Sequence, residues 1–310
     1  MTRQHPSAEV LRWAGSVAGS RVVAVTGLRE GAGPWLLRLG GPRGPAAAVL
    51  RTGSGPGGRR ALETEAAALE SAAGRGIAAP RLLGRALDGE PGDGSAAVLT
   101  TVVPGSSRMP ERVRPERMRA LGAAVAALHA VPSPPRPGLP RRSRPLADVD
   151  FAALRRARGR SSLFEEAERA VAEFALPGEE PVLVHGDLWQ GNTMWSGDTL
   201  TGIVDWDSAG SGHYGVDLGS LRCDAAVIHG AWAAAEALDG WLRASGRRPD
   251  GRVVAFWDVT AALSTPPDLA AWVPTLREQG AVLPDPAEVT ARRDAFLRTA
   301  LDRLAADGAG

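Results

Sequence analysis

Three polar residues in the middle of the chain have the types and the spacing of a phosphoryl-transfer site. Asp187 and Asn192 lie in the run HGDLWQGN at 185–192, and Asp205 directly follows the strand-like run 200–204. In one recurring type of phosphoryl-transfer site, an aspartate accepts the hydroxyl proton, and an asparagine and a second aspartate hold Mg²⁺. The pattern therefore predicts Asp187 as the proton acceptor, and Asn192 and Asp205 as the metal ligands.

The composition of the chain strengthens this interpretation. Asn192 is the only asparagine among 310 residues, and all 36 basic residues are arginine. Without lysine, the chain cannot contain the phosphate-binding loop Gly-x4-Gly-Lys-Ser/Thr. The glycine-rich run 53–58 is therefore expected to be a flexible connector. Mg²⁺ prefers one or two carboxylates together with phosphates and water, and the predicted ligand set matches this preference.

The bulk properties exclude several classes of protein. The formal net charge is +1 and the arginines are spread along the chain, which argues against a general nucleic-acid binder. Cys223 is the single cysteine, so no intrachain disulfide can form, and this fits a reducing compartment. The first residues lack an apolar signal core, and no uninterrupted apolar run approaches about 18 residues. We expect a cytoplasmic protein, monomeric or homodimeric, with no membrane or nucleic-acid partner.

The N-terminal third predicts a small, mostly antiparallel sheet with one inserted helix. Ser7 can cap an amphipathic helix to about residue 17. Turn residues separate the runs that follow, which alternate or are rich in β-branched residues. The expected strands are 21–25, 35–39, 46–51, 81–87 and 96–102, with a helix at 59–73 between the third and the fourth.

Beyond a hinge-like Val-Pro-Gly-Ser at 103–106, the pattern becomes helical. The expected helices are 115–129, 151–157 and 163–174, followed by a short strand at 182–184 and further helices interrupted by prolines at 266–267 and 284–286. The proline-rich stretch 132–145 is too long for a tight turn. It is expected to be either an insertion or a mobile flap.

The motif segments together resemble the signature of the aminoglycoside phosphotransferase family, which is related to choline kinases. The matching runs are HGDLWQGN at 185–192, GIVDWD at 202–207 and GVDL at 215–218. The resemblance implies an α+β, protein-kinase-like fold with two lobes. It further implies an N-terminal nucleotide-binding lobe at 1–102, a hinge at 103–107, and a helical catalytic and acceptor-binding lobe at 108–310.

The resemblance extends into the N-terminal third. Arg51 resembles the basic residue of the family's third strand that contacts nucleotide phosphates, and Glu65 resembles the helix glutamate that pairs with it. An arginine suits this position because its planar fork matches phosphate oxygens. The run 97–102 before Pro104 resembles the adenine-binding hinge, and the turn 28–34 departs from Gly-x-Gly-x-x-Gly. The nucleotide contacts implied near the hinge are Thr100, Thr101 and Val102.

Two histidines and one aspartate are expected to support the site rather than to react. His185 is interpreted as orienting the loop that carries Asp187, and Asp217 as holding this loop from behind. His129 is expected to be a packed histidine at a helix end, because nothing near it in the sequence offers a charge partner.

Three residues are predicted to meet the acceptor. Asp207 is expected to touch either a second metal ion or the substrate. Tyr214, the only tyrosine, is close in sequence to the metal-binding strand and is expected to face the substrate. Trp272 lies between proline-containing runs and is expected to form a pocket wall.

The resulting hypothesis is an Mg²⁺-dependent O-phosphotransferase that moves the γ-phosphate of ATP or GTP to a hydroxyl of a small molecule, such as an antibiotic or related natural product. One alternative is a metabolite kinase of the same fold with a choline-, homoserine- or ketosamine-like acceptor. Another is a nucleotide-binding pseudokinase, which the joint presence of Asp187, Asn192 and Asp205 argues against. Acidic residues exceed arginines only slightly after residue 205, so the sequence does not identify the acceptor.

Overall fold

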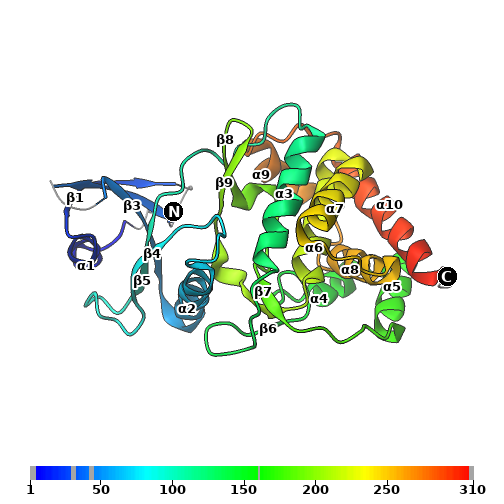
Figure 1. The fold of residues 1–310 in the computed structure, drawn as a ribbon, viewed down its shortest axis with the longest axis horizontal. Coiled ribbons are helices and arrows are strands. Elements are labelled where there is room, and N and C mark those ends of the chain that lie inside the picture. The colour runs from blue at the N-terminus through cyan, green and yellow to red at the C-terminus, as the bar shows by residue number, and fades with distance from the viewer. Residues whose placement is uncertain (1–4, 29–32, 42–44, 160, 307–310) are drawn as a thin grey trace.

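The chain folds into a small sheet-based part at the N-terminal end and a larger helical part (Figure 1). The computed structural model describes residues 5–28, 33–41, 45–159 and 161–306. The expected α+β architecture, with a small antiparallel sheet before a helical C-terminal part, is confirmed. The division into lobes at 1–102, 103–107 and 108–310 stays a prediction.

The N-terminal sheet has five strands in the order β1-β2-β3-β5-β4, and every neighbouring pair is antiparallel. Side chains alternate between its faces, as the pleat of a strand requires. In β2, Trp35, Leu37 and Leu39 all point inward. The strands are β1 Arg21–Gly27, β2 Trp35–Gly40, β3 Ala47–Gly53, β4 Leu82–Ala86 and β5 Ala96–Thr101.

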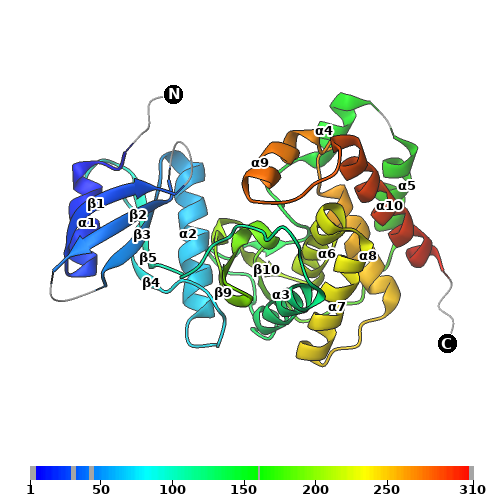
Figure 2. The ribbon, with the colours of Figure 1, turned by 90° about the horizontal axis from the view of Figure 1, so that it is seen from above.

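Helices α1 (Ala8–Ala18) and α2 (Gly55–Ala72) lie on opposite sides of this sheet (Figure 2). The Ser7 hydroxyl accepts a hydrogen bond from Val10 N, so the predicted helix cap is confirmed. Val10 packs with Leu37 and Leu50 in the core of the sheet. Burial of this apolar face holds α1 on the sheet.

Helix α2 contacts both parts of the molecule. Its first residue shows that one prediction was wrong. The run 53–58 is not a flexible connector, because α2 already begins at Gly55. Pro56 fits in the first helical turn, where its missing N–H removes no intrahelical bond. Leu62 packs against the sheet, whereas Leu69 belongs to the core of the helical part.

The helical part is built around one large core. Its buried residues come from most of the helices and include Met118, Leu121, Trp206, Trp241 and Leu297. The longer helices are α3 Pro115–Leu128, α4 Phe151–Arg158, α5 Ser162–Glu173, α6 Gly215–His229, α7 Ala231–Ser245, α8 Gly251–Leu263 and α10 Pro286–Ala305. Shorter ones are α9 Val273–Glu278 and the 3₁₀ turns η1 Gln190–Asn192, η2 Trp206–Ser208 and η3 Ala270–Trp272.

The proline-rich stretch 132–145 packs against other parts of the chain, which argues against a mobile flap. It contributes β6 (Arg141–Arg142), which pairs in parallel with β10 (Gly210–Gly212). Strand β10 also pairs in antiparallel fashion with β7 (Val182–Val184). Leu139 is fully buried in the large core. Contacts distant in the sequence therefore fix the stretch in place.

Candidate active site

Strand β7 delivers the loop that carries Asp187. Gly186 follows the strand with a φ of +80°, and a Cβ there would overlap with the carbonyl oxygen of Ser208. Only glycine tolerates both this positive φ and this close approach to the Ser208 backbone. Asp217, near the start of α6, accepts hydrogen bonds from the backbone N–H groups of His185 at 2.7 Å and Gly186 at 2.8 Å. Asp217 therefore lies behind the loop that carries Asp187, which is the position predicted for it.

The side chain of His185 joins the loop to the next strand. Its Nε2 lies 3.0 Å from the Val204 carbonyl oxygen, and its Nδ1 accepts from Asp187 N at 3.4 Å. The ring packs against Trp206 with 4.8 Å between the centroids. His185 therefore lies where it can orient the loop, and its ring nitrogens are occupied by protein groups.

The β8–β9 hairpin brings Asn192 and Asp205 together. Asn192 immediately precedes β8 (Thr193–Ser196) and Asp205 follows β9 (Thr199–Ile203) by two residues. The antiparallel register pairs Thr193 with Ile203, and Val204 N donates to Asn192 O at 2.8 Å. Residues 13 positions apart in the chain are thus adjacent in space because the open ends of a hairpin meet.

Asn192 also holds Asp187. Its Nδ2 donates to the Asp187 backbone oxygen at 2.8 Å and to the carboxylate Oδ2 at 3.1 Å. This orientation leaves the amide Oδ1 of Asn192 as the atom suited to a metal ion. Burial, helped by the negative charges of Asp205 and Asp207, raises the pKa of the Asp187 carboxyl.

Arg51 occupies the centre of a cluster of carboxylates. Its guanidinium lies 2.6 Å from Asp205 and 2.7 Å from Asp207, and its Nε lies 3.3 Å from Glu65. The predicted pairing of Arg51 with Glu65 is therefore present in the structure. The bonds to Asp205 and Asp207 were not foreseen, because the sequence does not show that the sheet and the β9 turn face each other.

Burial and neighbouring charges shift the pKa values of the groups in this cluster. Burial of Arg51 opposes its charge, but the carboxylates of Glu65, Asp205 and Asp207 raise its pKa above the ordinary value. Burial raises the pKa of Glu65 to about 7, although Arg51 works in the opposite direction. Asp205 adopts the left-handed region with a φ of 71°, which few residues other than glycine adopt without strain.

The cluster can accommodate a cation, as the guanidinium of Arg51 already shows. Asn192 and Asp205 offer a neutral and a charged oxygen, and Asp207 adds a second carboxylate nearby. Within the described ranges, no group of three or more His, Cys, Asp or Glu side chains forms a complete metal cage. A sparse oxygen set of this kind fits Mg²⁺ that takes its remaining ligands from phosphates and water.

The residues expected at the nucleotide hinge lie at the end of β5. Thr100 is buried, and Thr101 Oγ1 accepts from Arg81 N at 2.9 Å. Val102 is 40% exposed, directly after the strand. Residues 29–32 of the turn expected near the nucleotide lie outside the described residues. The nucleotide contacts of this region therefore stay a prediction.

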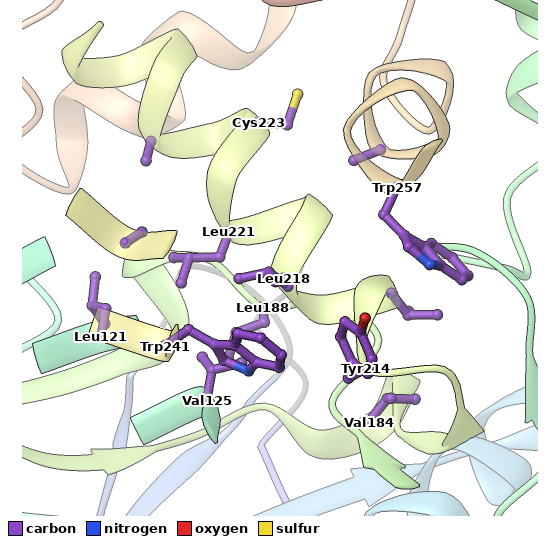
Figure 3. Close-up of a cluster of buried hydrophobic side chains, with 14 of the residues drawn as sticks. Leu121, Val125, Val184, Leu188, Tyr214, Leu218, Leu221, Cys223, Trp241 and Trp257 are labelled. Atoms are coloured by element: carbon purple, nitrogen blue, oxygen red, sulfur yellow. The ribbon is translucent and has the colours of Figure 1, made fainter. Parts of the chain in front are cut away.

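A pocket of about 330 Å³ opens next to Asp187. Trp272 forms part of its wall, so the structure brings together Asp187 and the tryptophan expected there. Trp189, which directly follows the loop, also lines the pocket. The structure does not place Tyr214 in this pocket. Its ring is buried beside Trp241 in the core, with 4.9 Å between the centroids, and it is not among the pocket residues (Figure 3).

Two residues have roles that the sequence did not show. His129 does have a charged partner, since its Nε2 lies 3.3 Å from Asp217 Oδ2 and Trp241 donates to its Nδ1 at 3.0 Å. Asp224 lines the pocket together with Asp187. Asp224 lies seven positions after Asp217 on α6, and the helical period places residues at this spacing on one face. This spacing is the sequence signal that could have identified Asp224.

The family model of the phosphotransferase enzyme family matches residues 15–257 of the chain. Solved structures with a similar fold include the aminoglycoside phosphotransferase APH(4)-Ia, with a TM-score of 0.61, 17% identity, and coverage of 98% of this chain and 100% of that one. Amicoumacin kinase hAmiN has a TM-score of 0.61, 15% identity and coverage of 96% and 94%. Macrolide 2'-phosphotransferase MphH from Brachybacterium faecium has a TM-score of 0.60, 18% identity and coverage of 97% and 99%.

No curated protein sequence matches the chain. Across the described residues, no helix combines the length and the apolar character that a membrane crossing requires. The similar structures share the kinase-like fold, and the family model covers most of the chain, including the segments that carry Asp187, Asn192 and Asp205. The chain therefore belongs to the phosphotransferase enzyme family and is an enzyme of the small-molecule kinase class.

Proposed function

We propose that the chain transfers the γ-phosphoryl group of ATP or GTP, with Mg²⁺, to a hydroxyl of an antibiotic or related natural product. The observation that carries the proposal is the position of Asp187. This carboxylate borders the pocket and is also bonded to Asn192, whose neighbour in space is Asp205. An acceptor in the pocket and a phosphoryl donor at the Arg51 cluster would thus meet at Asp187.

In the proposed reaction, Asp187 accepts the proton of the acceptor hydroxyl as that oxygen attacks the γ-phosphorus. A new oxygen–phosphorus bond forms, the bond to the bridging oxygen breaks, and the nucleoside diphosphate leaves with the electron pair. Asn192 and Asp205 would hold Mg²⁺, which neutralises phosphate charge when bound. Arg51 supplies a fixed positive charge for the donor phosphates, aimed by its bond to Glu65.

The solved relatives support the nucleotide and the class of acceptor. One APH(4)-Ia structure contains ADP and hygromycin B, and the hAmiN structure contains AMP-PNP, Ca²⁺ and Ami. The pocket of this chain supports an acceptor with apolar surface, because Trp189 and Trp272 both line it. Homoserine- and ketosamine-like acceptors have little apolar surface to place against these indole rings, so an acceptor with an apolar body is favoured over them.

The proposal predicts that Asp187→Asn, Asn192→Ala and Asp205→Ala each reduce phosphoryl transfer by at least about 100-fold, the usual scale for loss of a proton acceptor or charge-stabilising group. Release of ADP or GDP is measured with a panel of hydroxylated acceptors, and a melting curve checks each fold. Asp302→Asn is the matched control, because it removes one carboxylate from the exposed face of α10. Near wild-type turnover in any of the three variants would remove that residue from the proposed site.

A further inference from the structure

Helix α6 presents a line of polar residues along the side that faces the site. Asp217, Ser220 and Asp224 are three and four positions apart, which places them on one face of the helix. Asp217 holds the loop of Asp187 through two backbone N–H groups. Ser220 and Asp224 line the pocket into which Asp187 opens. The same helix thus supports the loop and contributes a carboxylate to the pocket wall.

Asp224, which is partly exposed in the pocket, differs from the buried aspartates Asp217 and Asp258. Asp258 binds the guanidinium of Arg222 through both carboxylate oxygens at 2.8 Å, and Asp217 is bonded to the loop. Asp224, by contrast, has no hydrogen bond or ion pair with any residue in the described part of the chain. An ionised carboxylate among mainly apolar side chains is costly unless a positive group or a hydrogen-bond donor meets it.

The rest of the pocket wall offers no positive partner. Its side chains are mainly apolar, with four hydroxyls from Ser220, Ser264, Thr265 and Thr275, and its described residues include no arginine or histidine. An anionic ligand would meet two carboxylates and no cation. A ligand with several amines would bring more positive charge than Asp187 and Asp224 can neutralise. The apolar wall residues that would contact a hydrophobic body are Leu146, Val227, Ile228, Ala261, Trp272 and Leu276.

The two carboxyl groups are close enough to affect each other. Burial raises the pKa of Asp224 to about 8, and the charge of Asp187 contributes to this shift. Among the described residues of the pocket wall, the only other titratable group is the Cys223 thiol, whose pKa burial holds well above its ordinary value. The pocket residues from α8, α9, η3 and the 145–146 segment carry no titratable group. One small molecule in the pocket would therefore place its hydroxyl at Asp187 and its positive group at Asp224.

We propose that Asp224 determines acceptor specificity by binding a single ammonium group of the substrate. The acceptor class is an amphipathic amino alcohol, with an amine close to the reacting hydroxyl and an apolar body against the tryptophan-lined wall. The assignment of the reacting hydroxyl rests on the proposed function, whereas the binding of the amine by Asp224 does not.

The first test compares three probes by calorimetry, without nucleotide or metal. Propranolol is an aromatic amino alcohol, 3-(1-naphthyloxy)-1,2-propanediol is its analogue without the amine, and hygromycin B carries several amines. The wild-type chain should bind propranolol about 10- to 100-fold more tightly than the diol, the usual scale for a charge-assisted hydrogen bond. Hygromycin B should bind at least about tenfold more weakly than propranolol, because the pocket cannot pair its additional charges.

Two variants show whether Asp224 is responsible. Asp224→Asn keeps the shape of the side chain, so it should remove the preference for propranolol while leaving diol binding unchanged. Asp302→Asn removes the same charge from an exposed position of α10 and should retain the preference. Equal affinity of the wild-type chain for propranolol and the diol would overturn the proposal. Equal weakening of both probes by Asp224→Asn would overturn it too, and so would tighter binding of hygromycin B.

Proton release provides an independent readout. At pH 6.5 the Asp224 carboxyl of the free protein is protonated, because its pKa is about 8. Binding an ammonium group requires the carboxylate, so propranolol should release up to about one proton, measured in buffers of different ionisation enthalpy. Asp224→Asn should abolish this release, and an undiminished release from the variant would refute the assignment. Failure of phosphoryl transfer alone would contradict the proposed function and leave these binding results unaffected.

Discussion

At the scale of single residues, Asp224 links binding to stability. Burial and the charge of Asp187 raise its pKa from 3.8 to about 8 on folding. Between these two pH values the folded chain holds the proton more tightly than the unfolded chain does. The stabilisation that comes from the protonated carboxyl is therefore fully present below about pH 4, and it is lost as the pH rises through 8.

We accordingly expect Asp224→Asn to stabilise the protein at alkaline pH. The free energy of unfolding at pH 8.5 should increase by about 1–3 kcal/mol, the usual cost of an enclosed polar group without a partner. The difference should disappear below about pH 4, where the wild-type carboxyl is protonated in both states. Urea unfolding at pH 3.5, 6 and 8.5 measures this, with Asp302→Asn as the control. A gain that does not change with pH would exclude the charge of Asp224 as its source.

At the scale of elements, close contact between helices shapes the helical part. Helices α3 and α7 pack against each other, and Trp241 from α7 donates a hydrogen bond to His129 at the end of α3. A Cβ added to Gly122 of α3 would overlap with the backbone oxygen of Ala237 on α7. The two helix backbones therefore approach closely because glycine leaves room for them.

Replacing this glycine should push the helices apart. Gly122→Ala is expected to reduce the free energy of unfolding by about 1–3 kcal/mol, as overpacking of a filled core does. Gly57→Ala is the matched control, because Gly57 lies in α2 with open space around its would-be Cβ. Alanine there should stabilise the chain by up to about 1 kcal/mol through its better helix propensity. Thermal and urea unfolding measure the stability of both variants. If Gly122→Ala and Gly57→Ala changed the free energy of unfolding in the same direction, the packing argument would be wrong.

At the scale of the whole molecule, Arg51 spans the boundary between the two parts. It projects from β3 of the N-terminal sheet and binds Asp205 and Asp207, which follow β9 of the C-terminal part. Helix α2 spans the same boundary, since Leu62 contacts the sheet and Leu69 the large core. The site therefore depends on both parts, and a donor nucleotide would have to share Arg51 with these carboxylates.

Replacement of Arg51 tests whether this contact serves the nucleotide. Arg51→Ala should weaken nucleotide binding by about 10- to 100-fold, because charge-assisted bonds to phosphate are lost. Arg51→Lys should restore part of the affinity, since lysine keeps the charge but lacks the planar fork. Arg59→Ala is the control, because the only ion pair that Arg59 forms with a described residue is the exposed one with Asp88 at 3.2 Å. Equal affinities of Arg51→Ala and Arg59→Ala in calorimetry would show that Arg51 does not bind the nucleotide.

The sequence by itself determined the elements and the order of the chemical groups. Alternation and helical periodicity are local properties, so the strands of the sheet and α1, α3 and α5 were predicted to within a few residues. The spacing of Asp187, Asn192 and Asp205 is also local, because one loop and one hairpin connect them. The pairing of Arg51 with Glu65 followed from the family resemblance and is present in the structure.

Only the tertiary structure decided which residues the pocket contains and which the core encloses. Tyr214 is close to the site in sequence, but α6 and α7 bury its ring beside Trp241. Asp224 drew no attention in the sequence, yet packing against α8 and the Asp187 loop turns it into a pocket carboxylate. Burial and charge pairing depend on segments that lie far apart in the chain, and neither periodicity nor spacing encodes which of these segments meet.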